Sequence, residues 1–115
     1  METICKKDIK VSNSNNNINY ISIHFYYYKN ENGCKGYYLS MQPIHKEKRD
    51  GLTYTEFMGF SGYKLLVCEV ARKSKKAESQ AKDIINNYIY EGMLNQVLEE
   101  NNLILADEND ISIKF

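Results

Sequence analysis

The sequence predicts an α+β fold. A mainly antiparallel sheet of four to five strands forms a meander, one long C-terminal helix packs on one face, and a short terminal strand follows. Short segments of alternating residues, separated by turn signals, extend from Tyr20 to Val70. One apolar stripe with spacings of three and four residues then extends from Ala77 to Leu98. The length of 115 residues fits a single domain, 1–115.

The strands are expected over residues 19–70. The segment from Tyr20 to Lys29 alternates most clearly, so that Ile21, Ile23, Phe25 and Tyr27 would face the core. Asn32-Gly33 predicts a tight hairpin turn after it. A second strand is predicted over 35–42, and Pro43 ends it or confines its end to an edge. A charged loop over 45–51 and a strand over 52–60 follow. A turn at 61–62 then leads into a strand over 63–70.

The helix is predicted over residues 74–102, with Ser74 as its N-cap. Gly92 is expected to kink the helix. The residues expected on its apolar stripe are Ala77, Ala81, Ile84, Ile85, Tyr88, Ile89, Met93, Leu94, Val97 and Leu98. Residues 1–18 are predicted to be irregular apart from a short edge strand at 9–11, and residues 103–115 to form a terminal strand region with candidate strands at 103–105 and 111–115.

Charge and motifs exclude several classes of protein. The formal net charge of +0 argues against a nucleic-acid or membrane binder that is held by bulk charge. The sequence has no apolar signal segment and no apolar run of membrane-spanning length, so we expect a cytoplasmic protein, or one in the host cytoplasm if a phage encodes it. Cys5, Cys34 and Cys68 are far apart in the sequence and no histidine lies near them, so no metal site is predicted. The sequence contains no G-x-S-x-G, no Cys–His pair and no H-E-x-x-H, so no catalytic site and no cofactor are predicted.

Basic residues gather where the last predicted strand meets the helix. They are Arg72, Lys73, Lys75, Lys76 and Lys82, which we call the basic helix start. Helix N-termini carry partial positive charge and favour Asp and Glu, so cations there work against the local field by a few tenths of a kcal/mol each. An anionic partner, a phosphate or a run of protein carboxylates, would explain them. The alternative is a solvated surface of well-spaced charges.

Ten tyrosines are the second candidate surface. Strand alternation places Tyr26, Tyr28 and Tyr38 on the face opposite the core. Exposed tyrosines suit protein interfaces and base stacking alike. The alternatives are therefore a face covered by the termini or by a homodimer partner, a protein-interaction face, and a nucleic-acid stacking face.

The function predicted from these features is that of a small non-enzymatic binding protein that acts by occupying a surface of its partner. Abundant Asn, Ile, Lys and Tyr are typical of AT-rich genes and favour a low-GC bacterium or one of its phages or plasmids. The concrete form is an inhibitor of a host protein or ribonucleoprotein complex that handles nucleic acid, such as a CRISPR effector. The alternative is a direct nucleic-acid or nucleotide-phosphate binder, and a small enzyme ranks third. No membrane partner is expected, and a homodimer stays open.

Overall fold

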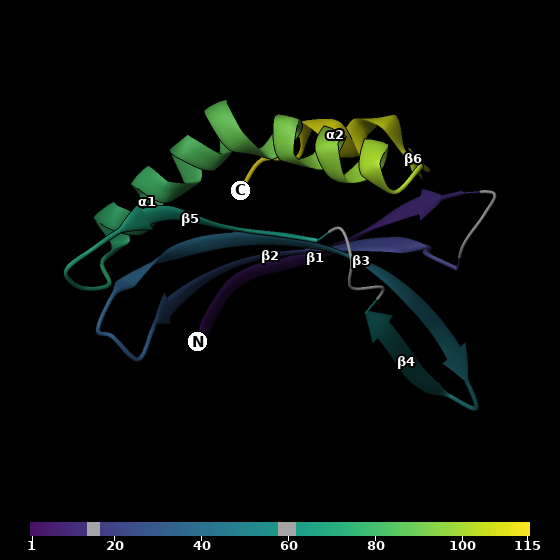
Figure 1. Cartoon of the computed structure of the whole chain (residues 1–115), viewed down its shortest axis with the longest axis horizontal. Helices are drawn as coiled ribbons and strands as arrows, with labels where there is room; N and C mark the ends of the chain where they lie inside the picture. The colour runs from purple at the N-terminus through teal and green to yellow at the C-terminus, as the bar shows by residue number, and fades with distance from the viewer. Residues whose placement is uncertain (14–16, 58–61) are drawn as a thin grey trace.

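The computed structural model describes residues 1–13, 17–57 and 62–115. Its strands join in one antiparallel sheet of order β4-β3-β2-β1-β6, with β5 also paired to β3, and its helices lie along one face (Figure 1). The strands are β1 (Glu2–Ser12), β2 (Tyr20–Lys29), β3 (Lys35–Arg49), β4 (Leu52–Phe57), β5 (Tyr63–Glu69) and β6 (Ile104–Leu105). The helices are α1 (Lys75–Ile84), a π-helix (Ile85–Ile89), α2 (Tyr90–Glu100) and a 3₁₀-helix (Glu108–Ser112). The predicted fold class is confirmed.

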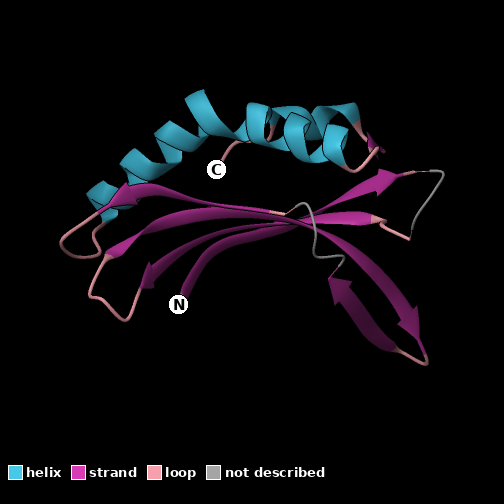
Figure 2. Cartoon of the chain, in the orientation of Figure 1, coloured by secondary structure: helices cyan, strands magenta, loops and turns pink. Residues whose placement is uncertain are grey.

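The core lies between the helices and one face of the sheet (Figure 2). The alternation predicted for β2 is confirmed, because Ile21, Ile23 and Phe25 are completely buried. Their cross-strand partners Pro43, Met41 and Leu39 lie on the same face of β3. The helices contribute Ala81, Ile85, Leu94 and Val97, also completely buried. In the described part of the chain, no helix lies on the opposite face of the sheet (Figure 2).

A π-helix interrupts the long helix and resets its apolar stripe. Ala77, Ala81 and Ile85 are buried at spacings of four, and the next buried residue, Tyr90, follows after five. The Tyr90 N–H donates to the Ile85 carbonyl, which is the i→i+5 bond of a π-helix. The prediction for Tyr88 is therefore wrong: the extra residue turns its side chain outward, and 84% of it is exposed. The irregularity falls at residues 85–89 rather than at Gly92.

Strand β3 is longer than predicted. It continues through Pro43 to Arg49, where a charged loop was expected, and then turns into β4. On the side away from β2, β3 pairs with β5 up to Met41 and with β4 from Ile44 onward. Among the described residues, Pro43 has a partner in β2 but none in β4 or β5, so the N–H that it lacks removes no described bond to those two strands.

The connection from β4 to β5 also differs from the prediction. Strand β4 ends at Phe57, while the last residues of the expected strand and Ser61 of the expected turn lie outside the described residues. In the described part of the chain, β4 and β5 pair with β3 and not with each other. The meander therefore holds as far as β4, and β5 returns to the other half of the same β3 edge.

Both ends of the chain correct the sequence prediction. Residues 1–18 were expected to be mostly irregular, but β1 pairs along β2 from Glu2 to Lys10, with a bulge between Thr3 and Cys5. Charged residues interrupt the period-two alternation of apolar side chains in β1. The strand therefore forms because it pairs with β2. Residues 111–115 were expected to form a strand but do not. There the Phe115 backbone bonds to the Asn86 side chain instead.

Candidate partner-binding surfaces

The uncovered face of the sheet is rich in tyrosine, and we call it the tyrosine face. Its aromatic and histidine side chains are Tyr20, His24, Tyr26 and Tyr28 of β2 and Tyr38 of β3, placed there by strand alternation. The rings form a packed ladder. Tyr26 stacks on Tyr38 with ring centroids 5.5 Å apart and planes 12° apart, and the His24 ring lies 4.6 Å from the Tyr26 ring at an interplanar angle of 33°. Cross-strand aromatic pairs of this kind stabilise the sheet.

Tyr26 is less accessible than the sequence suggested. Only 5% of the residue is exposed, because Tyr38 and His24 cover its ring. Burial, followed by the neighbouring phenols of Tyr38 and Tyr28, raises the pKa of Tyr26. The Tyr26 phenol therefore stays protonated. Tyr28 and Tyr38 are half-buried and form the reachable part of the ladder.

Lysines surround the ladder. The Lys64 ammonium lies 5.4 Å from the ring centroids of both Tyr28 and Tyr38, and that of Lys46 lies 5.3 Å from Tyr20. These are cation–π distances. Burial and then Lys6 lower the pKa of His24, so His24 is neutral at neutral pH. Among the described residues, the positive charge of this face therefore comes from lysines.

A two-stranded hairpin projects beyond the part of the sheet that the helices cover (Figure 1). We call it the arm: residues 44–57, from the second half of β3 through β4. Its turn residues Asp50 and Gly51 have φ values of 53° and 78°, the left-handed pair of a type I′ hairpin. Every residue of β4 is exposed, and Leu52, Tyr54 and Phe57 are 60%, 45% and 64% exposed.

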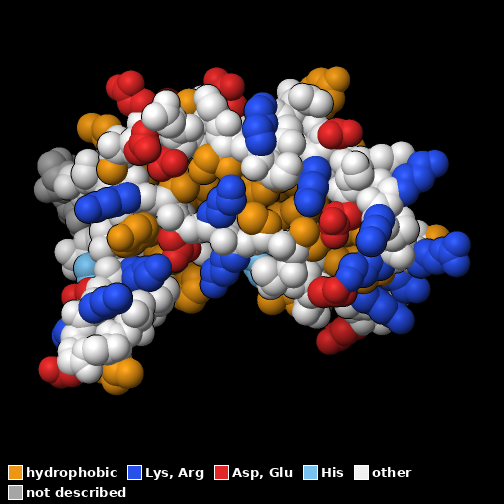
Figure 3. All heavy atoms as spheres, turned by 180° about the vertical axis from the view of Figure 1, so that it is seen from behind, with side chains coloured by type: hydrophobic (Ala, Val, Ile, Leu, Met, Phe, Trp, Pro, Cys, Tyr) orange, Lys and Arg blue, Asp and Glu red, His pale blue; other side chains and the backbone are white. Residues whose placement is uncertain are grey.

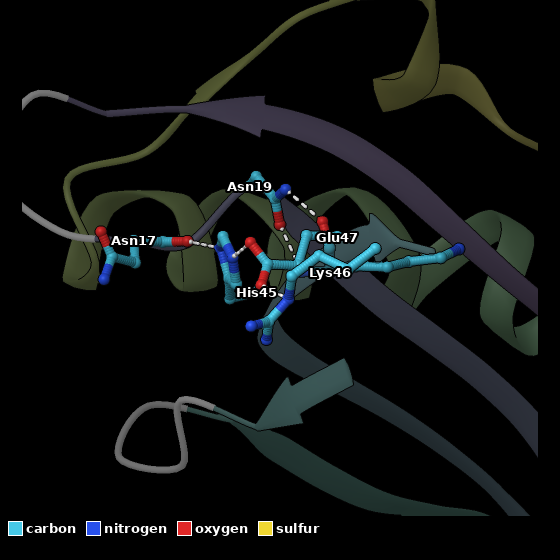
Figure 4. A network of polar contacts seen from close by, with 6 residues as sticks. Asn17, Asn19, His45, Lys46 and Glu47 are labelled. Atoms are coloured by element: carbon cyan, nitrogen blue, oxygen red, sulfur yellow. Dashed lines mark hydrogen bonds and ion pairs between the residues drawn. The ribbon is translucent and has the colours of Figure 1, made fainter. Parts of the chain in front are cut away.

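A polar network fixes the base of the arm (Figure 4). The Asn19 amide accepts a bond from the Lys46 N–H at 2.8 Å and donates to the Lys46 carbonyl at 2.7 Å. Asn19, which directly precedes the first residue of β2, therefore bonds to β3. His45 Nδ1 lies 2.6 Å from the Asn17 carbonyl, and its Nε2 lies 3.2 Å from Glu47. These contacts attach the base of the arm to the segment before β2, which supports a hairpin that would be marginally stable alone.

We expect His45 to report on this network. The bond to the Asn17 carbonyl, and then the bond to Glu47, raise the pKa of His45 above its ordinary 6.5. Protonation of His45 then stabilises the folded state below pH 6.5, and this contribution is lost as the pH rises through the raised pKa. An NMR titration should give a pKa above 6.5, lowered in part by Glu47→Gln. A pKa at or below that value would contradict the network.

The five residues of the basic helix start do not act as one cluster. Ser74 is the N-cap, as predicted, and its side chain accepts the Ala77 N–H at 3.1 Å. Lys73 pairs with Glu2, and Lys82 pairs with Glu78 at 3.6 Å. The other three, Arg72, Lys75 and Lys76, are exposed and have no ion pair among the described residues. Lysine and arginine side chains gather at the end of the molecule where α1 begins, away from the arm (Figure 3).

The described ranges contain neither a metal-binding cluster nor a membrane-spanning helix. No group of His, Cys, Asp and Glu side chains there could hold a metal ion. No described helix has the length and apolar character needed to cross a membrane. Two open hollows of about 320 and 360 Å³ flank the π-helix, and both include Tyr88, Ile89 and Gly92. Neither hollow is lined by histidine or cysteine.

Sequence reasoning missed the arm. The sequence predicts Leu52, Tyr54 and Phe57 within a strand of the sheet and residues 45–51 as a loop. The signal that could have found the arm is Asp50-Gly51, a type I′ turn pair with strand-forming residues on both sides. Comparison with known proteins adds no relative: no family model, curated protein or solved structure is significantly similar to this chain.

Proposed function

We propose that the protein is a non-enzymatic binding protein that acts by occupying a surface of another macromolecule, with the arm as its leading contact. The observation that carries this proposal is that every residue of β4 is exposed, including the large side chains of Leu52, Tyr54 and Phe57. Large exposed apolar side chains on a projecting element are typical of interaction sites. The polar network at the arm's base supports the proposal, because a fixed arm loses less entropy on binding.

The free edges of the sheet distinguish β4 from the other strands. Soluble proteins protect free strand edges with charges and bulges. The free edge of β1 carries Lys6, Lys7 and Asp8, and β5 carries a bulge between Leu66 and Cys68. By contrast, β4 reads Leu-Thr-Tyr-Thr-Glu-Phe, has a single charge and pairs with β3 without a bulge. An edge of this kind suits pairing with a partner strand.

The partner class that we propose is a host protein or ribonucleoprotein complex, with the protein as a stoichiometric inhibitor encoded by a phage or plasmid. The codon bias behind the Asn, Ile, Lys and Tyr content supports a low-GC mobile element. The identity of the genes that flank the coding sequence would test this origin directly.

An affinity capture experiment tests the arm. We expect the variant Leu52→Ser, Tyr54→Ser, Phe57→Ser to lose its captured partner by at least about tenfold, because buried aromatic anchors dominate interfaces. The control variant Tyr88→Ser, Ile104→Ser removes exposed apolar side chains elsewhere, 84% and 70% exposed in the folded chain. It should bind normally. Loss of the partner in the control variant, with binding retained in the arm variant, would contradict the proposal.

A second candidate is direct binding of nucleic-acid phosphates. The absence of ion pairs for Arg72, Lys75 and Lys76 in the described part of the chain favours it. This candidate requires affinity for nucleic acid that falls steeply with salt, by roughly 10³-fold or more between 50 and 200 mM for six or more phosphate contacts. Changing these three residues to Ala should remove such binding. Nucleic-acid binding that survives the substitution would eliminate this candidate site.

A further inference from the structure

We propose that the tyrosine face docks an acidic protein surface, so that the partner presents carboxylates to this side of the sheet. This inference rests on the proposed function and names the chemistry of the partner beside the arm. Three features of the face support it: its charge, its hydrogen-bond donors, and its continuity with the arm.

The charge of the tyrosine face differs from that of the whole chain. The strand registers place five lysines on it, against the two carboxylates Asp8 and Glu69. The lysines are Lys6, Lys10, Lys46, Lys48 and Lys64. Asp8 is already engaged by Lys46 at 2.8 Å. Because the chain as a whole has net charge +0, this excess concentrates positive charge on one side, and the complementary partner is anionic.

The remaining polar groups of the face are suited to carboxylates. Tyrosine hydroxyls can donate hydrogen bonds to carboxylate oxygens, as lysine ammonium groups do. The rings are poorly suited to stacking on bases, since the ring of Tyr26 is covered by Tyr38 and His24. A base would also have to displace Lys64 from Tyr28 and Tyr38. The face therefore presents donors and cations rather than open aromatic planes.

One side of β4 continues the same surface, while Leu52 and Tyr54 lie on its other side. Thr53, Thr55 and Phe57 of β4 lie opposite Lys48, Lys46 and Ile44 of β3, on the side of the strand that carries Tyr38. Leu66 of β5, 42% exposed, lies beside Tyr38. A partner that contacts Phe57 therefore meets the lysines next to it. Apolar anchors within a charged surround match the usual arrangement of a protein interface.

The test uses two labelled probes of opposite chemistry, poly-L-glutamate and oligo(dT), with fluorescence anisotropy at about 50 mM salt. The face variant is Lys6→Glu, Lys10→Glu, Lys64→Glu, and the matched control is Arg72→Glu, Lys75→Glu, Lys76→Glu. All six side chains are exposed and each variant makes the same change in net charge, so both should fold. Far-UV circular dichroism and thermal unfolding verify this.

We expect poly-L-glutamate to bind the wild-type chain more tightly than oligo(dT). The face variant should bind poly-L-glutamate at least about tenfold more weakly, and the control variant should differ less from wild type, because the probe lies on the sheet. Tighter binding of oligo(dT), an equal loss in both variants, or no binding of poly-L-glutamate would overturn the inference. None of these results bears on the arm, whose role is tested separately by the capture experiment with Leu52, Tyr54 and Phe57.

Discussion

Insertion of one alanine after Asn87 is expected to abolish cooperative folding, whereas deletion of Asn87 is expected to leave the fold intact. The π-helix at Ile85–Ile89 already holds one residue more than an α-helix needs. Deletion restores a spacing of four between Ile85 and Tyr90, which keeps both halves of the apolar stripe on the core. Insertion rotates the second half by about 100°.

The expected size of the insertion effect follows from burial. Tyr90, Leu94 and Val97 are 2%, 0% and 0% exposed. Removing such side chains from the core costs about 1.5–3 kcal/mol each, and the sum approaches the whole stability of a small domain, about 5–15 kcal/mol. Urea unfolding monitored by circular dichroism measures both variants. A cooperative transition in the insertion variant at the wild-type midpoint would show that the stripe does not depend on the π-helix.

Replacement of Tyr37 has the second large expected effect. Tyr37 is completely buried, and its ring contacts Phe25 and Tyr27 with centroids 6.0 and 5.3 Å away. Its hydroxyl donates to the Ser74 carbonyl at 3.0 Å and accepts the Ser74 N–H at 3.3 Å, which attaches the start of α1 to the sheet. Tyr37→Ala should lower the free energy of unfolding by about 3–5 kcal/mol, as for other large buried aromatics.

Tyr37→Phe distinguishes the contribution of the hydroxyl to stability from that of the ring. It removes only the two bonds to Ser74, and the Ser74 carbonyl keeps its bond from the Glu78 N–H at 3.0 Å. The expected loss is about 1 kcal/mol, the net value of a typical hydrogen bond. Chemical denaturation of both variants gives the comparison. A loss for Tyr37→Phe as large as that for Tyr37→Ala would contradict a core role for the ring.

Local signals in the sequence were sufficient for the central part of the fold. The alternation around Ile21, Ile23 and Phe25 and the N-cap Ser74 depend on a few neighbouring residues, and the structure has both. Strand β1 and the continuation of β3 past Pro43 depend on partner strands far away in the sequence. Glu2, for example, pairs with Tyr27. Such non-local pairing leaves little trace in local composition.

The candidate site was only partly accessible to sequence reasoning. Period-two alternation placed Tyr28 and Tyr38 on the uncovered face, but it could not show that Tyr38 and His24 bury Tyr26. The lysines near the tyrosines are brought there by register, since Lys64 of β5 pairs with Ser40 of β3. The arm needs Asn19, 27 residues away from Lys46, to hold its base. No local pattern encodes these contacts.

Hydrogen exchange with and without the captured partner tests the binding surface most directly. In the free protein, the outward amides of β4 have no described partner strand and should exchange rapidly. In the complex, we expect slower exchange within Leu52–Phe57 and in β5 beside Lys64, with no change on the outer side of α2. Protection confined to the outer side of α2, with β4 exchanging as in the free protein, would contradict binding through the arm and the tyrosine face.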